Sequence, residues 1–408
     1  MEILRADYLI TCDEDFKIIK DGVICFDKEI LKIGTAREIA DKFKDANITY
    51  MGKNSVLMPG LINPHVHLEF SANRTSLEYG NFIPWLNSVI KNREEILHKG
   101  NSEIIDKSLE SMLHSGTTTL GEISSFGDDF ESCLKTPQKV IYFNEILGSR
   151  PDSVDILFES FRSRLRVSEE SRDESFIPAI SIHSPYSTHP ILAKNALDIA
   201  RKEDYLVSTH FMESQAERDW LDNGNGEFIE FFNSFAPNAK PLSSAQEYLG
   251  LFYDTSALFT HCTKATENEV KTIKDMGGSI THCPVSNRLL NSGRLAIEKI
   301  DENILNLGTD GLSSNISLSL WDEMRSALMM HPLGDLQKLS QQLIKMCTAN
   351  GAKALKLNSG VLKEGKDADI ILLKLPDSVK DSQSLMAQII LHTKKVERVF
   401  INGKNITL

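Results

Sequence analysis

The sequence lacks the features that mark several large classes of protein. Its six cysteines are scattered without a C-x-x-C pair, so we expect reduced thiols and a cytoplasmic location instead of a disulfide framework. No apolar run approaches the roughly 20 residues of a membrane-spanning helix. The first residues, MEILRADYLI, also lack the basic-then-apolar pattern of a signal peptide. We therefore expect a cytoplasmic protein without a membrane partner.

Basic stripes are missing as well. The formal net charge is −12, and nucleic-acid binding needs clustered lysine and arginine, so we expect no nucleic-acid partner. No G-x-G-x-x-G follows the early strand candidates, which weakens a dinucleotide-binding fold. What is present is a hydrophobic content of 41% over 408 residues, enough for one large domain and a small one.

The two ends of the chain are rich in short strand patterns. ILRADYLIT, DGVICFD and EILKIGT stand near the start, and DADIILLK and VERVFINGK, with its Asn-Gly turn signal, stand near the end. We predict that residues 1–57 and 357–408 together form one small β-sandwich domain.

The stretch between them, residues 58–356, alternates apolar runs with helical patterns such as PILAKNALDIARKED. The strand candidates are 56–63, 117–123, 139–147, 176–182, 205–209, 256–260, 278–281 and 303–308. Eight strands alternating with helices predict an α/β fold, a (β/α)8 TIM barrel.

Polar residues stand at the ends of these strand candidates, where a barrel of this kind carries its chemistry. In chain order they are His65, His67, Glu122, Asn144, Glu145, His183, His210, His261, His282 and Asp310. His65 and His67 share one face of an extended segment. Imidazole and carboxylate groups suit Zn²⁺, with Fe²⁺ or Mn²⁺ as alternatives that ligand type alone does not separate. His65, His67, His210 and Asp310 would supply three nitrogens and one oxygen.

Five stretches, in order, resemble signatures of the amidohydrolase superfamily, in the branch of chlorohydrolases and deaminases. They are PGLINPHVHLE, THFMES, FTHC, THCPVSNRLL and LGTDGLSSN. The resemblance covers essentially the whole chain. It implies a metal, Zn²⁺ or else Fe²⁺, held by His65, His67, His210 and Asp310. It further implies that Glu213 shuttles protons and that His261 orients water or substrate, with Asp310 also taking part in catalysis.

The fourth strand end departs from the binuclear members of that superfamily, which carry a lysine there. FIPAISIHSPYS has no lysine and offers His183, so we expect one metal ion per chain. His183 matches a substrate-contacting position in deaminases of adenosyl compounds.

The chain is most similar to the aminodeoxyfutalosine deaminases of menaquinone biosynthesis, whose substrate is an adenine nucleoside carrying a benzoate group. This resemblance implies a small nucleoside partner and a cation for its carboxylate. The candidate contacts are Arg150 after strand three and Arg74, Glu78 and Trp85 in the long loop after strand one.

Several alternatives stay open. The substrate could be S-adenosylhomocysteine, methylthioadenosine or adenosine, or, for another aminohydrolase, cytosine or guanine. A barrel that serves only as a binding protein is a further alternative, and a homodimer is another open possibility. The full set of ligand-type residues argues against the binding protein, because a scaffold has no use for it.

Overall fold

The computed structural model describes residues 1–42, 47–72, 75–99, 102–236, 238–331 and 334–408. The chain divides into two compact units. The first comprises Met1–Asn63, Leu109–Leu120 and Ser319–Leu408, and the second comprises Pro64–Ser108 and Gly121–Leu318. The domain bounds predicted from the sequence, 1–57 with 357–408 and then 58–356, stay a prediction.

Both ends of the chain contribute strands to one sheet in the first unit, in the order β16-β15-β14-β5-β1-β2-β3, with β4 beside β1. The strands are β1 (Glu2–Ile10), β2 (Ile18–Phe26), β3 (Ile30–Thr35), β4 (Thr49–Tyr50), β5 (Ser55–Pro59), β14 (Ile370–Lys374), β15 (Arg398–Ile401) and β16 (Lys404–Ile406). The N-terminal β5 pairs antiparallel with the C-terminal β14, Met58 opposite Ile371. Phe26 and Phe400 pack edge to face in the core of this unit, with their ring centroids 5.2 Å apart.

The helices of the first unit are α1 (Ala36–Lys42), α12 (Leu320–Met330), α13 (Leu336–Met346), α14 (Ala349–Ala354) and α15 (Leu385–His392). A short 3₁₀ turn, η5 (Ser382–Ser384), precedes α15. Helix α12 begins with Trp321 fully buried, and its indole N–H donates to the carbonyl oxygen of Ser115 at 2.7 Å. A buried indole needs such an acceptor, so this bond fixes the start of the helix.

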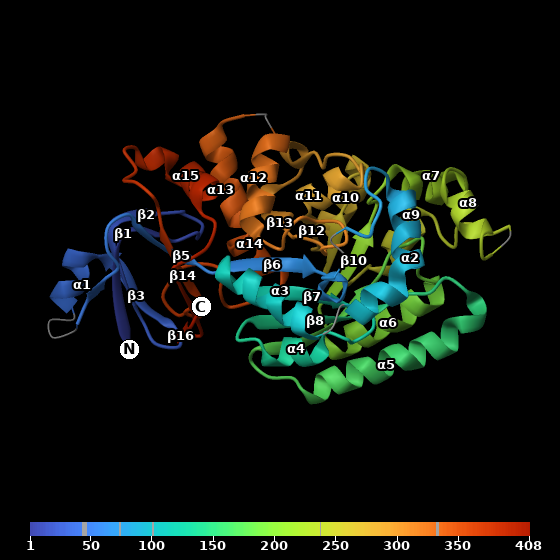
Figure 1. Cartoon of the computed structure of the whole chain (residues 1–408), viewed down its shortest axis with the longest axis horizontal. Coiled ribbons are helices and arrows are strands. Elements are labelled where there is room, and N and C mark those ends of the chain that lie inside the picture. The colour runs from blue at the N-terminus through green and yellow to red at the C-terminus, as the bar shows by residue number, and fades with distance from the viewer. Residues whose placement is uncertain (43–46, 73–74, 100–101, 237, 332–333) are drawn as a thin grey trace. The chain divides into compact units, whose positions relative to one another are not determined.

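The second sheet contains eight strands in chain order, from β6 to β13, each adjacent to the next. They are β6 (Leu61–Val66), β7 (Thr117–Ser124), β8 (Lys139–Ile146), β9 (Phe176–Ile182), β10 (Val207–Phe211), β11 (Ala257–His261), β12 (Ser279–His282) and β13 (Leu305–Leu307). The backbone N–H groups of Thr309 and Asp310 donate to the carbonyl oxygen of His65, which brings the last strand end to the first. The predicted (β/α)8 barrel is confirmed (Figure 1).

Helices follow the barrel strands along the chain (Figure 1). They are α2 (Phe82–Lys99), α3 (Ser102–His114), α4 (Phe130–Lys135), α5 (Val154–Glu170), α6 (Pro190–Glu203), α7 (Gln215–Asn223), α8 (Phe228–Asn233), α9 (Ala245–Leu251), α10 (Glu267–Asp275) and α11 (Pro284–Leu289). The 3₁₀ turns are η1 (Leu68–Phe70), η2 (Pro151–Ser153), η3 (Ile297–Lys299) and η4 (Glu302–Ile304). Capping boxes stabilise the N-termini of two of these helices. They are formed by Ser244 with Glu247 at α9 and by Thr266 with Glu269 at α10.

One predicted strand is divided in two. The apolar run 56–63 covers most of β5, in the sheet of the chain ends, and the first half of β6, in the barrel. Gly60 stands between them, where a Cβ atom would come within 2.2 Å of the Thr118 Oγ1 atom. Only glycine therefore fits this approach of backbone to side chain.

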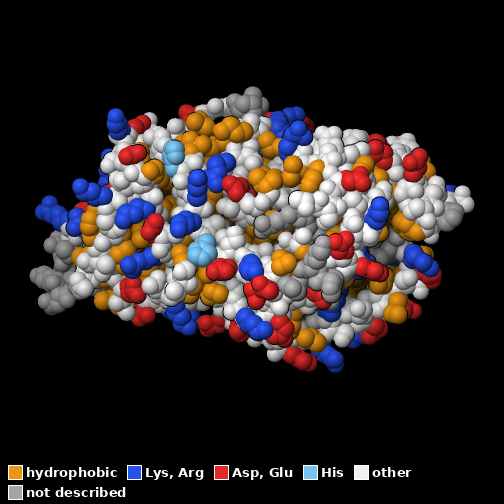
Figure 2. Space-filling view, in the orientation of Figure 1, with side chains coloured by type: hydrophobic (Ala, Val, Ile, Leu, Met, Phe, Trp, Pro, Cys, Tyr) orange, Lys and Arg blue, Asp and Glu red, His pale blue; other side chains and the backbone are white. Residues whose placement is uncertain are grey.

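Two further findings concern the helices and the cysteines. None of the described helices combines the length and the apolar character that a membrane crossing requires. The six cysteines all lie in the described part of the chain, are buried, and form no disulfide with one another. Acidic and basic side chains are intermingled on the face in Figure 2. The cytoplasmic location stays a prediction.

Candidate active site

Three histidines and an aspartate meet at the carboxyl ends of the barrel strands. His65 is on β6, His67 follows it, His210 is on β10 and Asp310 follows β13, and all four are buried. The ligand-type nitrogens of the three histidines lie within 4.8 Å of one another. The sequence-predicted ligand set is thus brought together.

The separations within this cluster suit a divalent ion. The Nε2 atoms of His67 and His210 are 3.3 Å apart. The Oδ1 atom of Asp310 lies 3.6 Å from His67 Nε2 and 3.8 Å from His65 Nε2. Ligand atoms at about 2.0–2.1 Å from a tetrahedral ion are about 3.3–3.4 Å apart. The residues present therefore fit such an ion.

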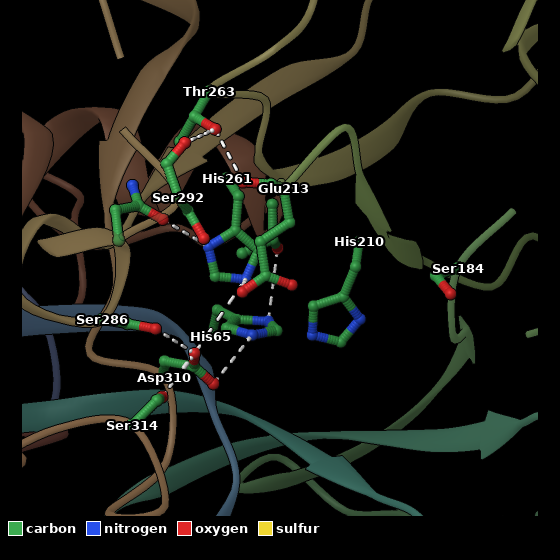
Figure 3. Close-up of polar contacts among 12 residues, drawn as sticks. His65, Ser184, His210, Glu213, His261, Thr263, Ser286, Ser292, Asp310 and Ser314 are labelled. Atoms are coloured by element: carbon green, nitrogen blue, oxygen red, sulfur yellow. Dashed lines mark hydrogen bonds and ion pairs between the residues drawn. The ribbon is translucent and has the colours of Figure 1, made fainter. Parts of the chain in front are cut away.

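Outer contacts orient these groups. The Nδ1 atom of His210 is 2.8 Å from the carbonyl oxygen of His183, so Nδ1 carries the hydrogen and Nε2 keeps its lone pair. The Oδ2 atom of Asp310 accepts from the hydroxyls of Ser286 and Ser314, at 2.7 and 2.8 Å (Figure 3). These contacts hold the donor atoms in place.

The protonation states also suit metal binding. Burial, followed by the charge of His65, lowers the pKa of His67 to about 3, and the same two causes bring the pKa of His210 well below its usual range. Burial alone would raise the pKa of Asp310, but the hydrogen bond of His65 and the charges of His261 and His67 bring it well below its usual range. Neutral imidazoles and an ionised carboxylate are the forms that bind a metal.

A second group adjoins the first. The Nε2 atom of His261 lies 3.6 Å from Glu213 Oε1 and 3.9 Å from Asp310 Oδ2, and Figure 3 shows all three side chains facing one space. The Nδ1 atom of His261 is 2.9 Å from Asn287 Oδ1, while the Asn287 amide nitrogen is 3.3 Å from His282 Nδ1. This assignment of the amide leaves the hydrogen of His261 on Nδ1 and a lone pair on Nε2.

Burial sets the titration of this second group. It lowers the pKa of His261 to about 4, so the ring is neutral at pH 7. Burial, with the charges of Asp310 and Glu217, raises the pKa of Glu213 well above its usual range. A carboxyl group with a raised pKa can both accept and release a proton near neutrality.

The backbone around Glu213 is held at both ends. The Oε2 atom of buried Glu217 accepts the N–H of Glu213 at 2.8 Å, and the Thr263 hydroxyl donates to the Glu213 carbonyl oxygen at 2.7 Å. Ser214 begins helix α7 as its N-cap, its hydroxyl accepting the N–H of Glu217. The neighbouring Met212 has a φ of +49°, so the chain turns sharply here.

Left-handed backbone recurs at the other strand ends. His261, Cys262 and Asp310 have φ values of +71°, +50° and +59°. Non-glycine residues in this region cost about 1–3 kcal/mol each unless the surroundings hold them. Such strain is concentrated at functional sites, and here it falls on residues of both clusters.

A cavity opens onto these groups. His67, His210, Glu213, His261 and Asp310 line one part of it. The apolar part is lined by Phe70, Trp85, Leu86, Val89, Ile90, Phe126, Leu147 and Tyr186. Catalytic-type groups next to an apolar wall are typical of a pocket for an aromatic small molecule.

The predicted substrate contacts divide into two sets. His183 and Trp85 line the cavity, and the Trp85 indole N–H donates to the carbonyl oxygen of Ser313 at 2.8 Å. Trp85 lies within helix α2, and not in the loop that the sequence suggested. Glu78 is exposed and is not among the described lining residues. These three contacts stay predictions, as do Arg150 and Arg74.

Arg150 lies on the surface. Its guanidinium pairs with Asp152, one contact being 3.1 Å between Nε and Oδ1, at the start of η2. Like Glu78, it is absent from the described residues that line the cavity. Arg74, the other predicted clamp, lies outside the described residues.

Sequence reasoning missed two residues beside the cavity. Arg93 lines the cavity and lies on the same face of helix α2 as Trp85 and Val89. The spacing of four residues between them was the available signal in the sequence. Glu69 is buried, and its carboxyl accepts the backbone N–H groups of residues 125–128, a loop that contributes two lining residues to the cavity. An acidic residue within the apolar stretch LEF was the signal for that role.

Comparison with known proteins identifies the family. The model of the Amidohydrolase family matches residues 56–406. The chain belongs to the amidohydrolase family. This confirms the family resemblance seen in the sequence motifs, and with it that the protein is a hydrolase. Enzymes of this family generally depend on a metal, and the two clusters described above supply groups that could bind one.

Individual relatives are deaminases. The chain is 44% identical to the aminodeoxyfutalosine deaminase of Nitratiruptor sp., over 95% of both chains. It is 34% identical to an adenosine deaminase of Helicobacter pylori, over 99% of both chains. The crystal structure of Helicobacter pylori aminofutalosine deaminase in complex with methylthio-coformycin superposes with a TM-score of 0.94, at 32% identity and covering 100% of both chains.

Proposed function

We propose that this protein is a metal-dependent hydrolase that deaminates 6-aminodeoxyfutalosine to futalosine and ammonia, a step of menaquinone biosynthesis. The observation that carries the proposal is the 44% identity with the Nitratiruptor aminodeoxyfutalosine deaminase, over 95% of both chains. The cavity supports it, because an apolar wall faces a cluster of ligand-type and proton-handling residues.

In this proposal His65, His67, His210 and Asp310 hold one divalent ion, Zn²⁺ in the first place and Fe²⁺ as the alternative. A bound ion lowers the pKa of water towards about 7 and so supplies a hydroxide nucleophile at neutral pH. Strand β9 ends at Ile182, His183 follows it, and neither the strand nor this end carries a lysine, which supports a single ion.

The reaction replaces the exocyclic amine of adenine with an oxygen. A C6–O bond forms and the C6–N6 bond breaks; of the two protons of water, one goes to ring nitrogen N1 and the other leaves with ammonia. Glu213 is suited to carry both, because burial raises its pKa and its carboxyl faces the same space as Asp310 and His261.

His261 orients the reacting groups in this proposal. Its Nδ1 is held by Asn287, so its Nε2 lone pair faces Glu213 and Asp310 and can accept a hydrogen bond from the attacking water. His183, which lines the same cavity, contacts the substrate. Trp85 offers an aromatic face to the base or the benzoate.

Adenosine is the second candidate substrate. The 34% identity with the Helicobacter pylori adenosine deaminase, over 99% of both chains, favours it over other bases. A nucleoside without a benzoate would leave part of the apolar wall unfilled, which is why we place it second.

Ammonia release from a panel of nucleosides tests the proposal. The panel contains 6-aminodeoxyfutalosine, adenosine, methylthioadenosine and S-adenosylhomocysteine, with cytosine and guanine as other bases. We expect the highest kcat/KM for 6-aminodeoxyfutalosine. An equal or higher value for adenosine would replace the proposed substrate, and release from none of the compounds in the panel would reject the deaminase itself. Size-exclusion chromatography of the same sample distinguishes a monomer from a homodimer.

A further inference from the structure

One residue that lines the cavity is positively charged, and its side chain is exposed to solvent. Among the described residues that line it, Arg93 is the one lysine or arginine. It lies on helix α2, whose residues Leu86, Val89 and Ile90 form part of the apolar wall. A single cation in an apolar wall predicts a ligand with an anionic group.

The position of Arg93 along α2 sets the distance between the two ends of such a ligand. Trp85 is tied to the loop of Asp310 by its hydrogen bond to Ser313, three residues further on. Arg93 is eight residues after Trp85, about 12 Å along the helix at 1.5 Å per residue. Arg93 thus lies about two helical turns from Trp85, the residue through which α2 contacts the loop that carries Asp310.

The guanidinium of Arg93 is placed by an aromatic ring. Its central carbon lies 4.2 Å from the centroid of the Phe126 ring. In the described part of the chain no ion pair to Arg93 is present, whereas Arg150 pairs with Asp152. Stacking on a ring leaves the edge of the guanidinium, with its N–H donors, open to a carboxylate.

We propose that Arg93 is a specificity-determining residue, which binds the benzoate carboxylate of the substrate while Phe126 and the apolar face of α2 cover its aromatic ring. The inference rests on the proposed function and names the side chain that selects this nucleoside over adenosine. An arginine suits this task, because its fork of donors matches the two oxygens of a carboxylate.

Two substitutions on one helix test this assignment. Arg93→Gln removes the charge, and Lys91→Gln, two residues away on α2 and outside the described lining, is the matched control. The substrates are 6-aminodeoxyfutalosine, its neutral carboxamide analogue and adenosine. We expect Arg93→Gln to lower kcat/KM for the carboxylate substrate by about 10- to 150-fold, chiefly through KM.

The other substrates and variants test whether the loss of kcat/KM is specific to the carboxylate substrate. Turnover of the carboxamide analogue and of adenosine should stay within about threefold in Arg93→Gln, which also shows that the variant folds. Arg93→Lys should keep part of the preference, since the charge remains without the fork. Lys91→Gln should behave as the unchanged protein with all three substrates.

The possible failures are separable. If the unchanged protein prefers the carboxylate substrate and Arg93→Gln keeps that preference in full, the assignment of Arg93 is overturned and the proposed function stands. A loss of preference in Arg150→Gln or Arg74→Gln instead would likewise overturn it. If the unchanged protein shows no preference for the carboxylate over its carboxamide, the proposed substrate fails and this inference fails with it.

Discussion

Replacing Glu69 with glutamine tests how the loop beside the cavity is held. The Glu69 carboxyl is buried and accepts four backbone N–H groups. Its Oε2 atom accepts from Ser125 at 2.8 Å, and its Oε1 atom accepts from Gly127 at 2.7 Å and Asp128 at 3.0 Å. The N–H of Phe126 lies between the two oxygens, at 3.0 and 3.1 Å.

The magnitude follows from these contacts. Burial, with the charge of Asp129, raises the pKa of Glu69 to about 8, and the backbone N–H donors oppose that rise because they stabilise the ionised carboxylate. The comparison is therefore made above pH 8, where both oxygens of the ionised carboxylate accept N–H groups. Glu69→Gln keeps one acceptor oxygen and replaces the other with an amide NH2 group. That group donates hydrogen bonds and does not accept them, so at least one buried N–H loses its partner. A buried unpaired group costs about 1–3 kcal/mol, so the loop should open about 5- to 150-fold more often.

Hydrogen exchange followed by mass spectrometry measures this directly. The peptide that covers residues 125–128 should lose protection in Glu69→Gln by that factor. Glu131→Gln is the control, because Glu131 is exposed and, among the described residues, forms its ion pair with Lys135 on α4. If the loop keeps its native protection in Glu69→Gln, the carboxyl does not hold it and our interpretation is wrong.

Three further perturbations test the site. Elemental analysis should find about one divalent ion per chain, lost in His67→Ala and in Asp310→Ala; two ions per chain, both needed for turnover, would contradict the single site. Glu213→Gln should keep the ion while kcat falls by roughly 10²–10⁴, and near-native turnover would remove Glu213 from proton transfer. Burial raises the pKa of Glu217 from 4.5 to about 7, so the contribution of this one carboxyl to stability is fully present below pH 4.5 and falls by about 3 kcal/mol as the pH rises through 7. In urea denaturation at pH 5 and pH 8, Glu217→Gln should remove that loss, and an equal loss in both proteins would refute it.

The sequence predicted the barrel and its catalytic end for a definite physical reason. In parallel strands the carboxyl ends meet on one side, so His65, His210 and Asp310 had to converge once each was placed at a strand end. Side chains that follow strands directly are therefore the most predictable part of the site.

Residues on helices and in turns were less predictable. Arg150 follows a strand too, but the turn that starts at Pro151 pairs it with Asp152 on the surface. Arg93 lies far along a helix, and whether it faces the cavity depends on how α2 packs, which periodicity alone does not give. The run 56–63 was predicted as one strand because it is apolar throughout, although its Pro59–Gly60 pair is a turn signal and marks the change of sheet.

The left-handed residues at the strand ends bear on how this protein could be engineered. Met212, His261, Cys262 and Asp310 occupy backbone geometry that glycine adopts more easily. Glycine at His261 or Asp310 would relieve backbone strain, but it would also remove side chains that carry the chemistry proposed for this enzyme. Substitutions that relieve strain at these two positions would therefore lower turnover. Substitutions that raise thermal stability should be sought in helices and loops away from this end of the barrel.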